Sequence, residues 1–121
     1  MTLVEQLDHL RAAAPGCGLV AFGDLNTRLV LRTSARAPWP QERLDELCAQ
    51  AARCFASADT GAVADHFGGA RQTEAVLLEP DSLRLFLRAP QDESDLLCVV
   101  CDSVGDYERV APLARDMVQR L

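Results

Sequence analysis

Two apolar runs in this chain are continuous, and two others alternate with arginine. Residues 18–22 read Gly-Leu-Val-Ala-Phe and residues 96–100 read Leu-Leu-Cys-Val-Val. A strand that is apolar at every position needs cover on both faces, whereas an alternating strand needs cover on only one. We therefore predict that the continuous runs are central strands of a sheet. The arginine-striped runs 27–33 and 83–88 are predicted to be their more exposed neighbours.

Helices and a hairpin are predicted around the first of these runs. The chain opens with the capping-box pattern Thr2-Leu3-Val4-Glu5, and helical spacing continues up to Pro15-Gly16. Residues 17–33 then have the pattern of a β-hairpin, in which Leu29 and Leu31 are expected to face the core. After a proline-rich break, a long helix carries one continuous apolar stripe, made of Leu44, Leu47, Cys48, Ala51, Phe55 and Ala58.

Three strands and a last helix complete the predicted fold. Residues 74–79, 83–87 and 96–101 have strand patterns, and the last helix contains Pro112, so it either begins close to that proline or is kinked there. The fold class is α+β, with helices on both faces of a five-stranded antiparallel sheet in the order 2-1-5-4-3. The elements follow as helix, two strands, helix, three strands, helix, in a single domain of residues 1–121.

A self-association surface is predicted on the third strand and the long helix. The run Ala75-Val76-Leu77-Leu78 is apolar on both faces, and at a sheet edge such a strand pairs readily with another chain. Beside the apolar stripe of the long helix lies a strip of small residues that would let a second helix approach closely. The high helix propensity of alanine is the alternative explanation of that strip. The predicted dimer interface consists of Ala49, Ala52, Ala56, Ala75, Val76, Leu77 and Leu78.

This arrangement resembles the Roadblock/LC7 family, a relative of the profilin-like and longin folds, over nearly the whole chain. The residues that carry the resemblance are Pro15-Gly16, the run 18–22, the turn 24–26, the helix 44–58 and the strands 75–78, 83–87 and 97–100. Many relatives have Asp-Gly in the first hairpin turn, where this chain has Asp24-Leu25-Asn26-Thr27. Asn26 is expected to supply the positive φ in that turn.

The resemblance implies a non-catalytic interaction module. Members of the family form homodimers or heterodimers in which the third strands pair into one sheet and the second helices lie together on one face. Bacterial members often accompany a small Ras-like GTPase and regulate it, and eukaryotic members are dynein light chains or scaffold subunits. Exposed residues of the second helix, Glu46, Gln50 and Arg53, are the predicted partner-binding positions.

Composition narrows the classes of partner. The chain has 121 residues and a formal net charge of -6, which disfavours nucleic acids and anionic membranes as partners. All 12 basic residues are arginine. Codon bias explains this composition, and selection for bidentate contacts at an interface is the alternative. No secretory leader opens the chain and no run approaches the about 18 apolar residues of a membrane span, so we expect a cytoplasmic protein with five reduced cysteines.

Candidate chemistry is sparse. Cys98 and Cys101 have Cys-x-x-Cys spacing, but residues three apart in a strand point to opposite faces, so core packing is the better interpretation. Asp65-His66 lies in a predicted loop, and residues 102–106 have the pattern of a turn and helix N-cap rather than a cation site. We therefore expect no catalytic residues, no metal and no cofactor. The alternatives to a GTPase regulator or scaffold are a small-molecule sensor of the PAS-like or profilin-like type and a cysteine-dependent enzyme.

Overall fold

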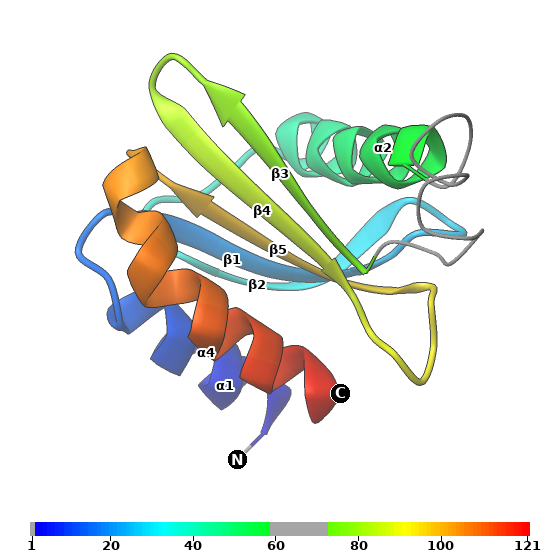
Figure 1. Ribbon diagram of the computed structural model, residues 1–121, viewed down its shortest axis with the longest axis horizontal. Coiled ribbons are helices and arrows are strands. Elements are labelled where there is room, and N and C mark those ends of the chain that lie inside the picture. Colours follow the sequence, from blue (N-terminus) through cyan, green and yellow to red (C-terminus); the bar gives the residue numbers. More distant parts are fainter. Residues whose placement is uncertain (1, 59–72) are drawn as a thin grey trace.

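The computed structural model describes residues 2–58 and 73–121. Within them, a five-stranded sheet lies between helices (Figure 1). The helices are α1 (Leu3–Ala12), α2 (Gln41–Ala58) and α4 (Tyr107–Gln119), and a 3-10 turn (Val104–Asp106) precedes α4. The strands are β1 (Cys17–Asp24), β2 (Leu29–Ala35), β3 (Glu74–Glu79), β4 (Ser82–Arg88) and β5 (Asp95–Cys101). The last helix begins at Tyr107, so Pro112 lies inside it.

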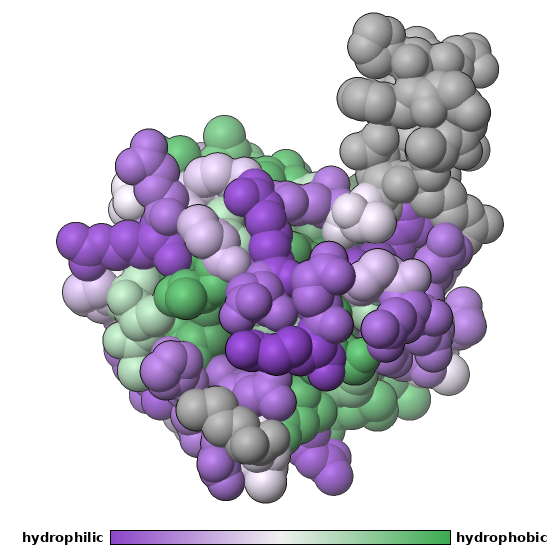
Figure 2. All heavy atoms as spheres, turned by 60° about the horizontal axis from the view of Figure 1, so that its bottom comes forward, coloured by the Kyte–Doolittle hydropathy of each residue, from purple (hydrophilic) through white to green (hydrophobic). Residues whose placement is uncertain are grey.

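The strand order is β2-β1-β5-β4-β3, and every neighbouring pair is antiparallel. The continuous apolar runs form β1 and β5, the two strands at the centre, which confirms the prediction drawn from them. The predicted fold class and element order are confirmed as well. Helices α1 and α4 cover one face of the sheet and α2 covers the other (Figure 1). Figure 2 views the molecule from the side of α1 and α4, where hydrophilic side chains alternate with apolar ones.

Each face of the sheet has its own core. Alternate residues of β4 and β5 point to opposite sides, so Leu85 and Val99 pack under α1 and α4, while Phe86 and Cys98 pack under α2. All four are at most 1% exposed. The larger core includes Leu7 and Leu10 of α1 and Val110, Ala114 and Met117 of α4; the smaller includes Leu47, Cys48, Ala51 and Phe55 of α2.

The predicted orientation of the β2 leucines is wrong. The pairing of β1 with β2 shifts register between Phe22 and Gly23, which inserts an extra residue into β2 and disturbs its alternation. Val30 packs against the core under α2, while Leu29 and Leu31 are 48% and 47% exposed. Regular alternation, the basis of the prediction, holds only where a strand has no bulge.

The first hairpin turn also differs in detail from the prediction. Arg28, with φ of 58°, is the non-glycine residue that takes a positive φ, and Asn26 does not. The Asp24 carboxylate instead accepts hydrogen bonds from the backbone N–H groups of Asn26 (2.8 Å) and Thr27 (3.4 Å). This local side-chain turn fixes the start of the loop, so the left-handed residue falls at its end.

A cluster of polar side chains fastens α4 to the start of β3. Arg115 donates to both carboxylate oxygens of Glu74, at 2.9 Å each, and the Tyr107 hydroxyl lies 3.3 Å from the same carboxylate. The hydrogen bonds from Arg115, more than any other cause, hold the pKa of Glu74 below its ordinary value of 4.5. The first residue of the edge strand β3 is thereby attached to the helix layer.

This ion pair predicts a specific acid sensitivity. A carboxyl whose pKa is lower in the folded state stabilises the fold above its unfolded pKa, and this contribution is lost as the pH falls through the folded value. Stability should therefore fall below about pH 4.5, by up to about 1 kcal/mol from this half-exposed pair. Urea unfolding at several pH values should show a flatter profile for Glu74→Gln. Arg115→Gln should flatten it too, because Arg115 is the main cause of the lowered pKa, and an unchanged profile in this variant would contradict the assignment.

Candidate functional site: the β3 edge and the outer side of α2

Strand β3 is the sheet edge next to α2 (Figure 1). Its six residues pair with β4 without a register shift. Ala75 and Leu77 point toward α2 and are partly buried against the core there. Val76 and Leu78 point to the opposite face, where they are 43% and 63% exposed. The strand is therefore apolar on both faces and unpaired on its outer side within the described residues.

Gln50 and the predicted alanine strip lie on different sides of α2. Gln50 accepts a hydrogen bond from Arg84 Nη1 of β4. Ala52 follows Gln50 by two positions, which is about 200° around an α-helix, so the two side chains point to nearly opposite sides. Ala49 and Ala52 are half-buried and Ala56 is exposed.

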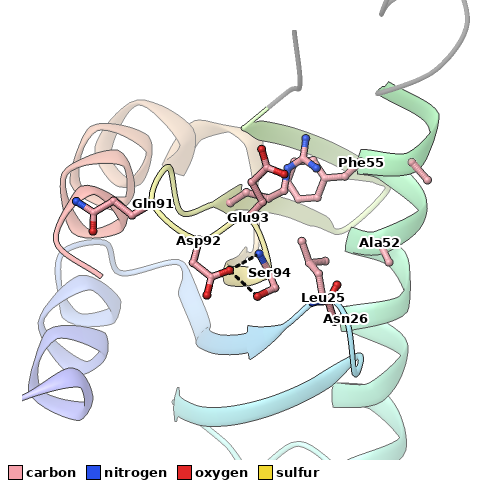
Figure 3. Close-up of a pocket in the computed structure, with 10 residues that line it drawn as sticks. Leu25, Asn26, Ala52, Phe55, Gln91, Asp92, Glu93 and Ser94 are labelled. Atoms are coloured by element: carbon pink, nitrogen blue, oxygen red, sulfur yellow. Dashed lines mark hydrogen bonds between the residues drawn. The ribbon is translucent and has the colours of Figure 1, made fainter. Parts of the chain in front are cut away.

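Ala52 and Ala56 face a cavity of about 550 Å³ at one end of the sheet (Figure 3). Its other walls are the β1–β2 turn, with Leu25 and Asn26, and the loop 91–94 between β4 and β5. Sequence reasoning predicted neither the cavity nor the position of these two alanines beside it. The loops that form it are brought together only by the antiparallel order of β1, β5 and β4.

A buried arginine lies in this cavity. Arg88 is only 5% exposed, and its guanidinium carbon is 4.3 Å from the centre of the Phe55 ring, the geometry of a cation–π contact. At the rim, the Asp92 carboxylate accepts hydrogen bonds from the backbone N–H (3.0 Å) and hydroxyl (2.6 Å) of Ser94, which lower the pKa of Asp92 (Figure 3). Burial raises the pKa of Asp95, with smaller contributions from Asp92 and Asp24. The cavity thus combines a buried cation with an acidic rim.

The three predicted partner-binding residues of α2 differ in their exposure and in their contacts. Arg53 Nη2 lies 2.7 Å from Glu46 Oε1, two turns away along the same helix. Both side chains are more than half exposed, so this pair is available on the surface of α2. Gln50 is half-buried and held by Arg84.

The cysteines are core residues on both faces. Cys98 and Cys101 belong to different cores, which confirms that they point apart. Burial raises the pKa of Cys48 to about 11 and raises that of Cys98. Spacing along the chain did not reveal that Cys17 of β1 lies directly opposite Cys101 of β5. The hydrogen bond shared with Cys17, followed by burial, raises the pKa of Cys101, and the same hydrogen bond lowers that of Cys17.

The remaining candidates for chemistry have plain structural positions. Asp65-His66 lies outside the described residues. Asp102 forms an ion pair with Arg36 at 3.2 Å. Residues 102–106 lead through a turn into α4, but neither Ser103 nor Asp106 makes the side-chain capping hydrogen bond expected in this segment. The described parts of the chain contain no group of three or more potential metal ligands. None of the described helices is long and apolar enough to cross a membrane.

Comparison with known proteins gives structural matches alone. No family model and no curated protein matches the sequence. A structure of MglB with tetrameric arrangement has a TM-score of 0.79 and 25% identity, covering 98% of this chain and 83% of its own. The gliding protein MglB from Thermus thermophilus has a TM-score of 0.77 and 24% identity, covering 96% and 82%. A Roadblock/LC7 domain from Streptomyces avermitilis has a TM-score of 0.69 and 16% identity, covering 96% and 94%.

Proposed function

We propose that this chain, which has the fold of Roadblock/LC7 domains, is a non-catalytic regulatory module that forms a homodimer and binds a small Ras-like GTPase. The observation that carries the proposal is the β3 edge, an outer strand that is apolar on both faces. Soluble monomers normally protect such an edge, because its free backbone groups pair with other chains. Pairing with a second copy of β3 would continue the sheet across a two-fold axis.

The features of the opposite edge strand, β2, support β3 as the edge that pairs with a second copy. Strand β2 carries the bulge opposite Phe22 and the exposed charge of Arg32, and the left-handed residue Arg28 comes directly before it. Bulges and charges are the features by which proteins keep an edge strand from pairing. Strand β3 has neither a bulge nor a charge between Glu74 and Glu79. The two edges therefore differ in the way expected if one is solvent-exposed and the other is an interface.

The helix contact in such a dimer follows from the position of the edge. Gln50 and its partner Arg84 lie on the flank of α2 beside β4 and β3, so we place the contact between the two α2 helices on this flank. Ala52 and Ala56 then remain beside the cavity at the end of the sheet. In this arrangement the interface comprises Ala75, Val76, Leu77 and Leu78 together with the Gln50 side of α2.

The GTPase is proposed from the family resemblance, in which bacterial members accompany such a partner. Two similar structures are of MglB, and one of these is described as a tetrameric arrangement, which supports self-association of this fold. A regulator without catalytic groups acts by binding one nucleotide state of its partner more tightly than the other. Glu46 and Arg53 lie four residues before and three residues after Gln50, on the outer side of α2. This exposed pair is the proposed contact, because both side chains are more than half exposed.

A pull-down from native extract tests this proposal. Tagged protein is incubated with GDP in one arm and a non-hydrolysable GTP analogue in the other, and bound proteins are identified by mass spectrometry. We expect a small GTPase in one arm and at least tenfold less of it in the other. Arg53→Glu should lose it, whereas Arg120→Glu, which breaks the exposed Asp116 pair on α4, should retain it. Recovery of no GTPase in either state would contradict the proposed partner.

A further inference from the structure

A second cavity, of about 260 Å³, lies at the opposite end of α2 from the first. Arginines from three separate segments line it: Arg36 from the connection after β2, Arg43 from the first turn of α2 and Arg84 from β4. Trp39, the single tryptophan of the chain, lines it as well. Asp81 and Asp102 line the cavity too, so its three guanidinium groups face two carboxylates, which leaves a small local excess of positive charge in a chain with a net charge of -6.

Several polar groups in this cavity make no hydrogen bond within the described residues. Arg43 stacks on the Trp39 ring at 4.0 Å and makes no hydrogen bond or ion pair with the described side chains there. The Nε of Arg84 and the Oγ of Ser82 are buried without a hydrogen-bond partner in the described parts of the chain. Buried polar atoms in proteins are normally satisfied, so unsatisfied donors around one space indicate a ligand that brings acceptors.

The acidic groups nearby leave this donor surplus in place. The Asp102 carboxylate forms an ion pair with Arg36, with Oδ2 3.2 Å from Nη2. Glu79 lies 3.4 Å from Arg84 Nε, an ion pair that does not meet hydrogen-bond geometry. Asp81 is exposed on the turn between β3 and β4. The guanidinium of Arg43 therefore has its hydrogen-bond donors available for a ligand. The side chain of Arg84 is only 14% exposed, and its Nε makes no hydrogen bond within the described residues.

We propose that this cavity binds the phosphate group of a small molecule. Guanidinium groups present planar, paired donors that match oxyanions, and a tetrahedral phosphate offers acceptor oxygens in several directions, as donors from three segments require. The space is larger than one phosphate, and the Trp39 ring gives it an apolar wall, so it has room for the organic part of a phosphate monoester. The negative net charge of the chain disfavours a nucleic acid backbone as the source. This inference does not depend on the proposed GTPase partner.

Trp39 fluorescence tests the proposal directly, because the chain has no other tryptophan. The protein is titrated with inorganic phosphate, and with sodium chloride at equal ionic strength. We expect a saturable change with phosphate alone. The affinity should be about tenfold weaker in Arg43→Gln and Arg84→Gln. Arg32→Gln removes an exposed arginine of β2 that lies outside this cavity, and its affinity should stay within twofold of the wild type.

A second arm replaces inorganic phosphate with glycerol phosphate. Tighter binding of the monoester would identify a small phosphorylated molecule as the ligand, and equal binding would identify phosphate itself; both support the site. A response no greater than that to chloride overturns the proposal. An equal loss of affinity in Arg32→Gln also overturns it, because binding would then follow net charge alone. Arg43 is exposed, so its variant is expected to fold, and its thermal melt monitored by circular dichroism verifies this.

Discussion

The substitution Leu78→Asp is expected to convert the proposed dimer into a folded monomer. Leu78 is 63% exposed in the single chain, so the substitution should leave the stability of the monomer nearly unchanged. In the proposed dimer, Leu78 would lie on the paired β3 edge, where a carboxylate would lose water and the apolar contact would be lost. We expect dimerisation to weaken at least about 100-fold, which corresponds to roughly 3 kcal/mol. Sedimentation velocity over a concentration series measures this constant.

Leu31→Asp is the matched control. Leu31 is 47% exposed on β2, at the opposite edge of the same sheet, so this variant introduces the same charge on a comparable leucine. It should remain a dimer. Leu77→Asp is a harsher test, since Leu77 also packs against α2, and it should give monomer or insoluble protein. A dimeric Leu78→Asp variant, or equal dissociation of Leu31→Asp, would contradict the β3 interface.

The central strands could be predicted because their signal is one of composition. Residues 18–22 and 96–100 are apolar at nearly every position, and burial on both faces follows from that alone. The edge position of β3 followed from the short turn to β4 and the central places already taken by β1 and β5. These inferences needed only the nearest neighbours of each strand.

Features that depend on register could not be predicted in the same way. The exposure of Leu29 and Leu31 follows from one extra residue in β2, which no periodicity in the sequence marks. Cys17 and Cys101 are 84 positions apart and meet because β1 and β5 pair with a particular alignment. Spacing rules examine residues close in sequence, so a contact of this kind has no local signal.

The two cavities were missed for a related reason. Arg36, Arg43 and Arg84 belong to three elements, and their convergence depends on how α2 lies across the sheet. The absence of lysine was the one trace in the sequence, and codon bias explained it equally well. The alanine strip of α2 was visible, but a helical pattern cannot say which flank faces the β3 edge. The proposed choice of flank rests on the contact between Gln50 and Arg84.

Phe86→Ala is expected to have the largest effect on stability. Phe86 is fully buried on β4 beneath α2, between Ala75 of β3 and Cys98 of β5 in the sheet. Removing a buried phenyl ring costs about 3–5 kcal/mol, because the surrounding side chains close the space only in part. A domain of this size is stable by about 5–15 kcal/mol, so the loss is a large share of the total. Urea unfolding monitored by circular dichroism measures it.

The same substitution links the core to the interface. Phe86 supports α2 and sits beside β3, the two elements of the proposed dimer contact, so Phe86→Ala should weaken dimerisation through a less fixed edge. Leu29→Ala removes a side chain that is 48% exposed on β2 and should cost no more than about 1 kcal/mol. If Phe86→Ala cost as little as Leu29→Ala, the packing of α2 against the sheet could not be what holds the β3 edge in position. The core under α2 therefore contributes to the stability of the monomer and also to the geometry of the surface proposed to bind a second copy.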